Sequence, residues 1–174
     1  LLRLMMVPFL VYFLHEAWFG VALGLFLVAG LSDAADGFLA KRLGQETRLG
    51  RVLDPVADKA LVVTLYITLG WVGWVPFWLV VAVVSRDIII VSGALLFHFL
   101  TGELEIRPTY LSKANTAVQL GFLALILVDA ASRLDLGIGS QYLSLVVLVT
   151  TVGSGLQYIL LWLRKAVHYE DATG

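Results

Sequence analysis

The stretch Ser32-Asp33-Ala34-Ala35-Asp36-Gly37-Phe38-Leu39-Ala40-Lys41, followed by Gly50, Asp54 and Asp58, decides how this chain is interpreted. It places four aspartates in a sequence that is otherwise strongly apolar. An ionised carboxylate at the centre of a bilayer costs roughly 2.5–3.5 kcal/mol on insertion scales. Four neighbouring carboxylates therefore need counter-charge. Nearby cations offer some of it (Lys41, Arg42, Arg48, Arg51 and Lys59), and a divalent metal ion offers it more compactly.

The spacing of these residues predicts two helices that turn acidic faces toward each other. Positions spaced i, i+3, i+4 and i+7 share one helix face, and this set is Asp33, Asp36, Gly37 and Ala40. A second face has the spacing i, i+4 and i+8 and holds Gly50, Asp54 and Asp58. The polar segment 41–49 would join the two helices. Oxygen ligands without Cys or His nearby suit a hard cation such as Mg²⁺ or Mn²⁺.

Composition indicates an all-α integral membrane protein made of one domain, residues 1–174. The chain is 60% hydrophobic with a mean hydropathy of +0.91, and its apolar runs are long enough to cross a bilayer. The net charge of −1 favours no nucleic-acid partner, and the absence of Cys excludes thiolate metal sites. The first residue is Leu1 rather than Met, so we expect an N-terminal truncation. No cleavable signal peptide is expected.

Hydropathy predicts six transmembrane helices, at about 1–14, 18–40, 50–69, 75–100, 111–131 and 141–163. Each except the first is near the ~20 residues that a spanning helix needs. A polar tail is expected after the sixth.

The distribution of Lys and Arg predicts how these helices are oriented. Placing the loop 41–49 in the cytoplasm leaves one cation, Arg133, on the outside. It places nine at cytoplasmic ends: Arg3, Lys41, Arg42, Arg48, Arg51, Arg107, Lys113, Arg164 and Lys165. Both termini and the acidic site would then be cytoplasmic, and we expect a bacterial inner membrane. Three tryptophans would form an outer aromatic belt: Trp71, Trp74 and Trp78.

From Asp33 to Asp58 the sequence reads D-x2-D-G-x2-A-K-x8-G-x3-D-x3-D. This pattern closely resembles the signature of the CDP-alcohol phosphotransferases, which are integral membrane enzymes of phospholipid synthesis. The family has Arg after the Ala, whereas this chain has Lys41 followed by Arg42. Lysine meets a phosphate as a point charge rather than as a fork, so the identity of that contact differs. The resemblance implies attack by an alcohol on the β-phosphorus of a CDP-linked lipid, with CMP leaving.

The resemblance also implies roles for individual residues. Asp33, Asp36 and Asp54 would hold a first Mg²⁺ or Mn²⁺, and Asp33, Asp54 and Asp58 would shape a second metal position. Asp58 is the candidate general base for the acceptor hydroxyl. The residues implied to bind the CDP donor are Asp36, Gly37, Ala40, Lys41, Arg42, Gly50 and Asp54. Family members are commonly homodimers.

Two other interpretations of the aspartates remain. They could be helix caps and surface ion-pair partners near the bilayer edge. They could also belong to a divalent-cation transporter, because acidic faces between helices mark ion paths. The transporter fits less well, because the acids cluster at one end and do not line a path.

A separate set of residues is predicted to form the acceptor pocket. Its candidate residues are Lys59, Arg86, Arg107, Lys113 and Asn115. Arg86 and Asp87 lie deep in an apolar helix and must pair with something. They could form an internal ion pair to which Lys59 contributes, or Arg86 could face the acceptor phosphate.

The segment from Arg107 to Gln119 resembles the mitochondrial-type cardiolipin synthases of the same family. Related phosphatidylglycerophosphate synthases usually carry a second Lys where this chain has Asn115. One cation fewer suits the single charge of a phosphodiester better than the charge near −2 of a monoester. The expected substrates are therefore CDP-diacylglycerol and phosphatidylglycerol, and glycerol 3-phosphate is the alternative acceptor. Lys113 could instead be an interfacial lysine that extends toward water.

Overall fold

The computed structural model describes the backbone of residues 2–43, 48–101 and 109–173, and side chains in 4–32, 59–93, 95, 96, 99 and 109–162. All regular structure within these ranges is helical: α1 Leu2–His15, α2 Phe19–Leu43, α3 Arg48–Trp71, α4 Phe77–Thr101, α5 Tyr110–Ser132 and α6 Gly137–Thr173. The all-α prediction is confirmed. Five helices match the predicted segments closely. The sixth helix, α6, covers the predicted segment and continues through residues 164–173, the expected polar tail.

Local backbone chemistry explains where several helices begin and end. Ala17 and Gly73 adopt positive φ, at 59° and 88°, in the turns after α1 and α3. Pro76 directly precedes α4. The side chain of Thr109 caps α5 by accepting a hydrogen bond from the Ser112 amide at 3.2 Å. Arg133 ends α5 in the left-handed conformation, with φ 51°.

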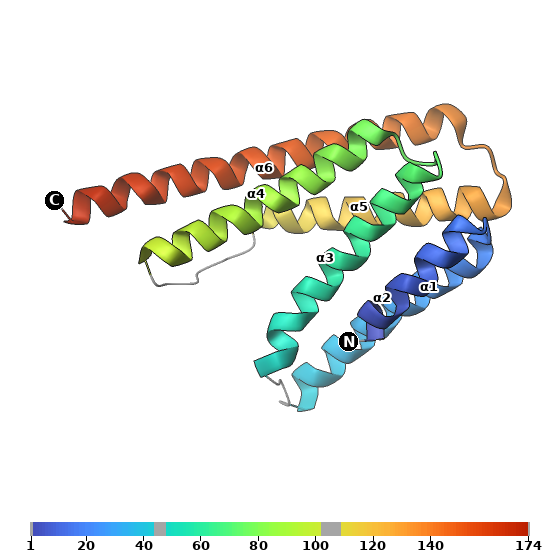
Figure 1. Ribbon diagram of the computed structural model, residues 1–174, viewed down its shortest axis with the longest axis horizontal. Coiled ribbons are helices and arrows are strands. Elements are labelled where there is room, and N and C mark those ends of the chain that lie inside the picture. Colours follow the sequence, from blue (N-terminus) through green and yellow to red (C-terminus); the bar gives the residue numbers. More distant parts are fainter. Residues whose placement is uncertain (1, 44–47, 102–108, 174) are drawn as a thin grey trace.

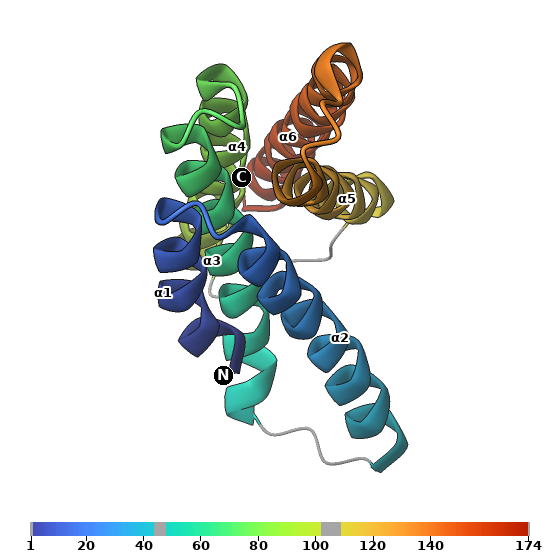
Figure 2. The same cartoon turned by 90° about the vertical axis from the view of Figure 1, so that its right-hand side faces the viewer.

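The helices form two groups of three (Figures 1 and 2). In the C-terminal group, α6 packs along both α4 and α5. In the N-terminal group, α1 packs against α2 and α3. The groups meet where α2 lies on α5 and where α3 contacts α4 and α5. The described parts of α2 and α3 thus share two neighbours, α1 and α5.

The core is built from apolar residues where the two groups meet. Tyr66 of α3 stacks on Phe122 of α5, with ring centroids 6.2 Å apart, and both residues are almost fully buried. Leu79 of α4 is also fully buried there. Gly70 lets α3 approach Val80 closely, since a Cβ at Gly70 would lie 2.6 Å from Val80 Cγ2. This core fixes α3 relative to α4 and α5.

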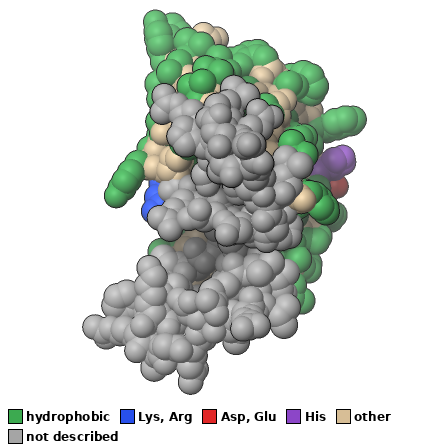
Figure 3. All heavy atoms as spheres, turned by 90° about the vertical axis from the view of Figure 1, so that its left-hand side faces the viewer, with side chains coloured by type: hydrophobic (Ala, Val, Ile, Leu, Met, Phe, Trp, Pro, Cys, Tyr) green, Lys and Arg blue, Asp and Glu red, His purple; other side chains and the backbone are tan. Residues whose placement is uncertain are grey.

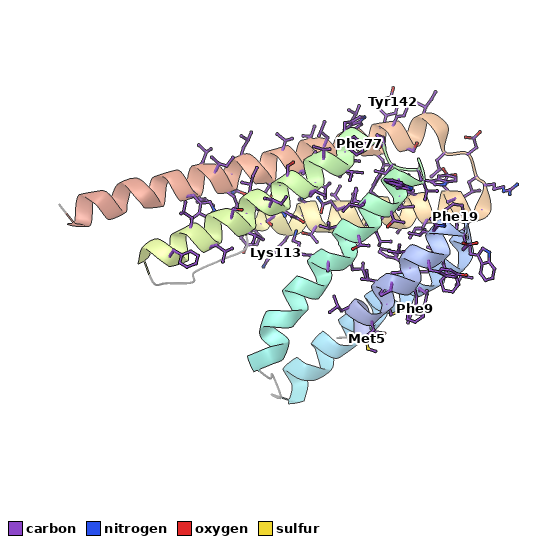
Figure 4. All side chains as sticks on the ribbon, in the orientation of Figure 1. Met5, Phe9, Phe19, Phe77, Lys113 and Tyr142 are labelled. Atoms are coloured by element: carbon purple, nitrogen blue, oxygen red, sulfur yellow. The ribbon has the colours of Figure 1, made fainter. Side chains whose placement is uncertain are left out.

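The outside of the bundle is also apolar. Figure 3 presents one face of the molecule, and hydrophobic side chains cover much of its described surface. Figure 4 shows Met5, Phe9 and Tyr142 on the exterior, and each is at least 60% exposed, as is Phe77. Large apolar side chains in such numbers are costly in water and ordinary against lipid. The exterior therefore suits a bilayer.

Two described segments are long and apolar enough to cross a membrane, Tyr110–Ser132 and Gly137–Trp162. Three shorter apolar stretches lie on the remaining helices: Leu4–His15, Phe19–Ser32 and Lys59–Trp71. The last two are the described portions of α2 and α3, which continue into the acidic signature. These membrane-type helices fit a membrane protein.

Candidate functional site

The signature falls on two consecutive helices, as its spacing predicted. Asp33 and Asp36 are in α2, and Gly50, Asp54 and Asp58 are in α3. Residues 44–47 alone separate the two helices. The side chains of ten predicted site residues lie outside the described part: Asp33, Asp36, Gly37, Ala40, Lys41, Arg42, Gly50, Asp54, Asp58 and Arg107. Their roles stay predictions. The arrangement in which the two acidic helix faces turn toward each other also stays a prediction.

The predicted metal site consists of carboxylate oxygens, which can be compared with the ligands that metal ions prefer. Among the side chains that the structure describes, no three of His, Cys, Asp or Glu come together. The four signature aspartates, which are not among them, supply oxygen donors from two helices joined by a short link. Such a donor set fits Mg²⁺ or Mn²⁺.

An ion-pair cluster begins directly after the signature. Lys59 Nζ and Arg86 Nη1 both contact the same oxygen, Asp87 Oδ1, and each distance is 2.6 Å. Arg86 and Asp87 are buried, with 4% and 7% exposure. The Lys59 side chain is 41% exposed. The structure therefore shows the internal ion pair, with Lys59 as a third member.

Arg86 connects this cluster to two more helices. Its Nη2 donates to Ser112 Oγ of α5 at 2.6 Å and to Ser154 Oγ of α6 at 2.8 Å. The guanidinium also lies 6.0 Å from the ring centroid of Tyr158. Both terminal nitrogens of Arg86 are thus occupied by protein groups. Ser112 was not predicted as a partner, because nothing in a helical pattern shows which neighbouring helix a hydroxyl meets.

A second buried polar cluster lies between α5 and α6. Gln119 Nε2 donates to Thr151 Oγ1 at 3.2 Å, and Thr151 Oγ1 donates to Asn115 Oδ1 at 3.0 Å. All three side chains are at most 1% exposed. Tyr66 of α3 donates to the backbone oxygen of Gln119 at 3.4 Å. Sequence reasoning missed Thr151, whose only signal is a threonine in an apolar helix.

The two described candidates at the start of α5 face different surroundings. Lys113 is exposed, and its Nζ lies 5.9 Å from the ring centroid of Tyr110. Asn115 is fully buried against Thr151. The structure therefore does not bring these two side chains to one surface.

A pocket of about 450 Å³ lies between α2, α3 and α5. Its polar lining residues are Lys59, Thr116 and Gln119, and the rest are apolar or Gly: Phe26, Leu27, Ala29, Gly30, Leu31, Leu61, Val62, Leu120 and Gly121. Leu31, at its edge, is 70% exposed. In sequence, Lys59 directly follows the signature segment 33–58, and Leu31 lies two residues before it. The pocket is therefore an apolar cavity that adjoins the acidic segments of both helices.

Comparison with known proteins identifies the family of this chain. The family model for CDP-alcohol phosphatidyltransferase matches residues 1–167. The chain belongs to the CDP-alcohol phosphatidyltransferase family. This confirms the resemblance inferred from the signature.

Individual relatives fall into two groups. The chain is 34% identical over 172 residues to rat cardiolipin synthase (CMP-forming), and 33% identical over 172 residues to the human protein of that name. Each alignment covers 90% of this chain and 57% of the relative, so the chain spans little more than half of their length. It is also 35% identical over 133 residues to the Escherichia coli CDP-diacylglycerol–glycerol-3-phosphate 3-phosphatidyltransferase, covering 73% of this chain and 72% of that protein.

Proposed function

We propose that this protein transfers a phosphatidyl group from CDP-diacylglycerol to phosphatidylglycerol, giving cardiolipin and CMP. The observation that carries the proposal is the complete aspartate signature on α2 and α3 of a chain that belongs to this family. The names of the rat and human relatives support the choice of acceptor.

We propose further that all six helices span the membrane, with both termini and the signature on the cytoplasmic side of a bacterial inner membrane. The apolar exterior and the distribution of Lys and Arg support this arrangement. A homodimer is the proposed assembly, by analogy with the family.

The reaction exchanges one phosphorus–oxygen bond for another. The acceptor hydroxyl oxygen bonds to the β-phosphorus of the donor, and the bond from that phosphorus to the bridging oxygen breaks, so CMP leaves. Asp58 takes the hydroxyl proton. Mg²⁺ or Mn²⁺ held by Asp33, Asp36, Asp54 and Asp58 would neutralise charge on the pyrophosphate.

The other signature residues would position the donor. Gly37, Ala40 and Gly50 lack bulky side chains, which leaves room for the cytidine and its phosphates. Lys41 and Arg42 supply positive charge beside them. The pocket between α2, α3 and α5 gives the apolar surroundings that a lipid substrate needs next to this polar site.

A second candidate function is phosphatidylglycerophosphate synthesis, with glycerol 3-phosphate as acceptor. The Escherichia coli relative favours it, since its name states that acceptor. Purified protein supplied with labelled CDP-diacylglycerol and either acceptor separates the two. CMP release with phosphatidylglycerol alone supports the leading proposal, and release with glycerol 3-phosphate alone supports the second.

The proposed cause of acceptor choice is charge at position 115. We expect Asn115→Lys to raise the ratio of glycerol 3-phosphate to phosphatidylglycerol turnover, because a monoester gains more from an added cation. A cation at this buried position also lowers the stability of the protein. The ratio of the two turnover rates is therefore measured, because a loss of folded protein lowers both rates equally. Asn115→Leu is the matched control for lost amide hydrogen bonds. An unchanged ratio in Asn115→Lys would show that charge at this position does not select the acceptor.

A further inference from the structure

Among the side chains that the structure describes, the ion-pair cluster carries more positive than negative charge. Lys59 and Arg86 share a single carboxylate, that of Asp87, and both contact its Oδ1. Asp87 Oδ2 has no hydrogen-bond partner among the described side chains. With its three members in their usual ionised forms, the cluster has a net charge of +1. A surplus cation beside an apolar cavity favours an anionic group in that cavity.

The surplus charge is accessible at Lys59 rather than at Arg86. Arg86 is 4% exposed, and its terminal nitrogens are occupied by Asp87, Ser112 and Ser154. The Lys59 side chain is 41% exposed and lines the pocket between α2, α3 and α5. Its ammonium has three donors, and Asp87 takes one of them. Lys59 thus presents a cation to the edge of an apolar cavity.

We propose that Lys59 binds the phosphodiester of the acceptor lipid, and that an acyl chain of that lipid lies in the pocket. A diester carries one negative charge, which matches the surplus of the cluster. The pocket is apolar apart from Lys59, Thr116 and Gln119, as a lipid chain requires. Asp87 is a positioning residue, because it fixes the Lys59 ammonium at 2.6 Å. This inference rests on the proposed function and assigns Lys59 to the acceptor rather than to CDP-diacylglycerol.

Direct lipid binding tests the site without requiring turnover. Purified protein in phosphatidylcholine nanodiscs would be titrated with spin-labelled phosphatidylglycerol, and in parallel with spin-labelled diacylglycerol, which lacks the phosphate. We expect Lys59→Gln to weaken phosphatidylglycerol binding about tenfold, the size of a charge-assisted hydrogen bond, and to leave diacylglycerol binding unchanged. Lys59→Arg should retain most of the wild-type affinity for phosphatidylglycerol.

Arg133→Asn is the matched control for general attraction of anionic lipid. It also removes one cation, at the far end of α5, and asparagine tolerates the left-handed conformation there. An equal loss in Arg133→Asn and Lys59→Gln would overturn the proposal, as would no loss in Lys59→Gln.

Kinetics separate this inference from the proposed function. We expect Lys59→Gln and Asp87→Asn to raise KM for phosphatidylglycerol while KM for CDP-diacylglycerol is unchanged. A rise confined to CDP-diacylglycerol would overturn the inference, because the phosphate at Lys59 would belong to the donor. The two proposals can also fail separately. If the wild-type protein releases no CMP but binds phosphatidylglycerol selectively, and Lys59→Gln removes that binding, the proposed reaction is refuted and the lipid site remains.

Discussion

Replacing Asp87 with asparagine tests how the ion-pair cluster holds α3, α4, α5 and α6 together. The change keeps the shape of the side chain and removes the charge that faces Lys59 and Arg86, each at 2.6 Å. Arg86 is then a buried cation whose Nη2 retains its hydrogen bonds to Ser112 and Ser154. Leaving a buried charge without its partner typically costs about 3–5 kcal/mol. We expect Asp87→Asn to lose about 3 kcal/mol, because both serines still solvate the guanidinium.

Reversible unfolding of the purified protein in mixed detergent and SDS micelles measures this loss. A double-mutant cycle with Lys59→Gln and another with Arg86→Gln would divide it between the two ion pairs. The Arg86–Asp87 coupling should be the larger, because those side chains are 4% and 9% exposed. The half-exposed Lys59 should contribute roughly 1 kcal/mol or less. A loss below about 0.5 kcal/mol in Asp87→Asn, or a larger coupling to Lys59 than to Arg86, would refute this reasoning.

Three further predictions concern the acidic site and helix packing. Asp58→Asn should retain CDP-diacylglycerol binding and lose CMP release, and turnover near the wild-type rate would remove Asp58 as the base. Exhaustive chelation should abolish CMP release and added Mn²⁺ or Mg²⁺ should restore it, whereas full activity without metal would exclude metal dependence. Gly70→Ala should destabilise the protein by about 1–3 kcal/mol, because the new Cβ would meet Val80, while the control Gly121→Ala, with nothing within 4 Å, should cost far less. Equal effects of the two glycine changes would mean that the contact between α3 and α4 is not tight.

Hydropathy predicted where the helices lie because a membrane imposes a minimum length on each apolar segment. At the C-terminal end of α6 the helix is longer than the apolar segment. The apolar run stops near residue 163, but the helix continues through Arg164, Lys165 and Ala166, which are good helix formers without being apolar. Hydropathy therefore measures the length that a membrane can cover, and a helix can continue beyond that length.

Sequence spacing predicted the two helices that carry the aspartates better than it predicted the buried polar clusters. The four aspartates follow a fixed helical spacing, so the helices that carry them could be predicted from the sequence. The need of Arg86 and Asp87 for a partner was also evident, because an apolar helix cannot leave them uncompensated. Their other partners, Ser112 and Ser154, come from helices whose neighbours only the fold determines. The same holds for Thr151, which joins Asn115 to Gln119.

The central claim is that phosphatidylglycerol accepts a phosphatidyl group from CDP-diacylglycerol at the site formed by α2 and α3. Its most direct test is the stoichiometry of one reaction, with purified protein, Mn²⁺, unlabelled CDP-diacylglycerol and phosphatidylglycerol labelled in its terminal glycerol. We expect one CMP released for each cardiolipin formed, with the glycerol label retained in cardiolipin. Cardiolipin formed with release of labelled glycerol and no CMP would contradict it, as would CMP release that requires glycerol 3-phosphate.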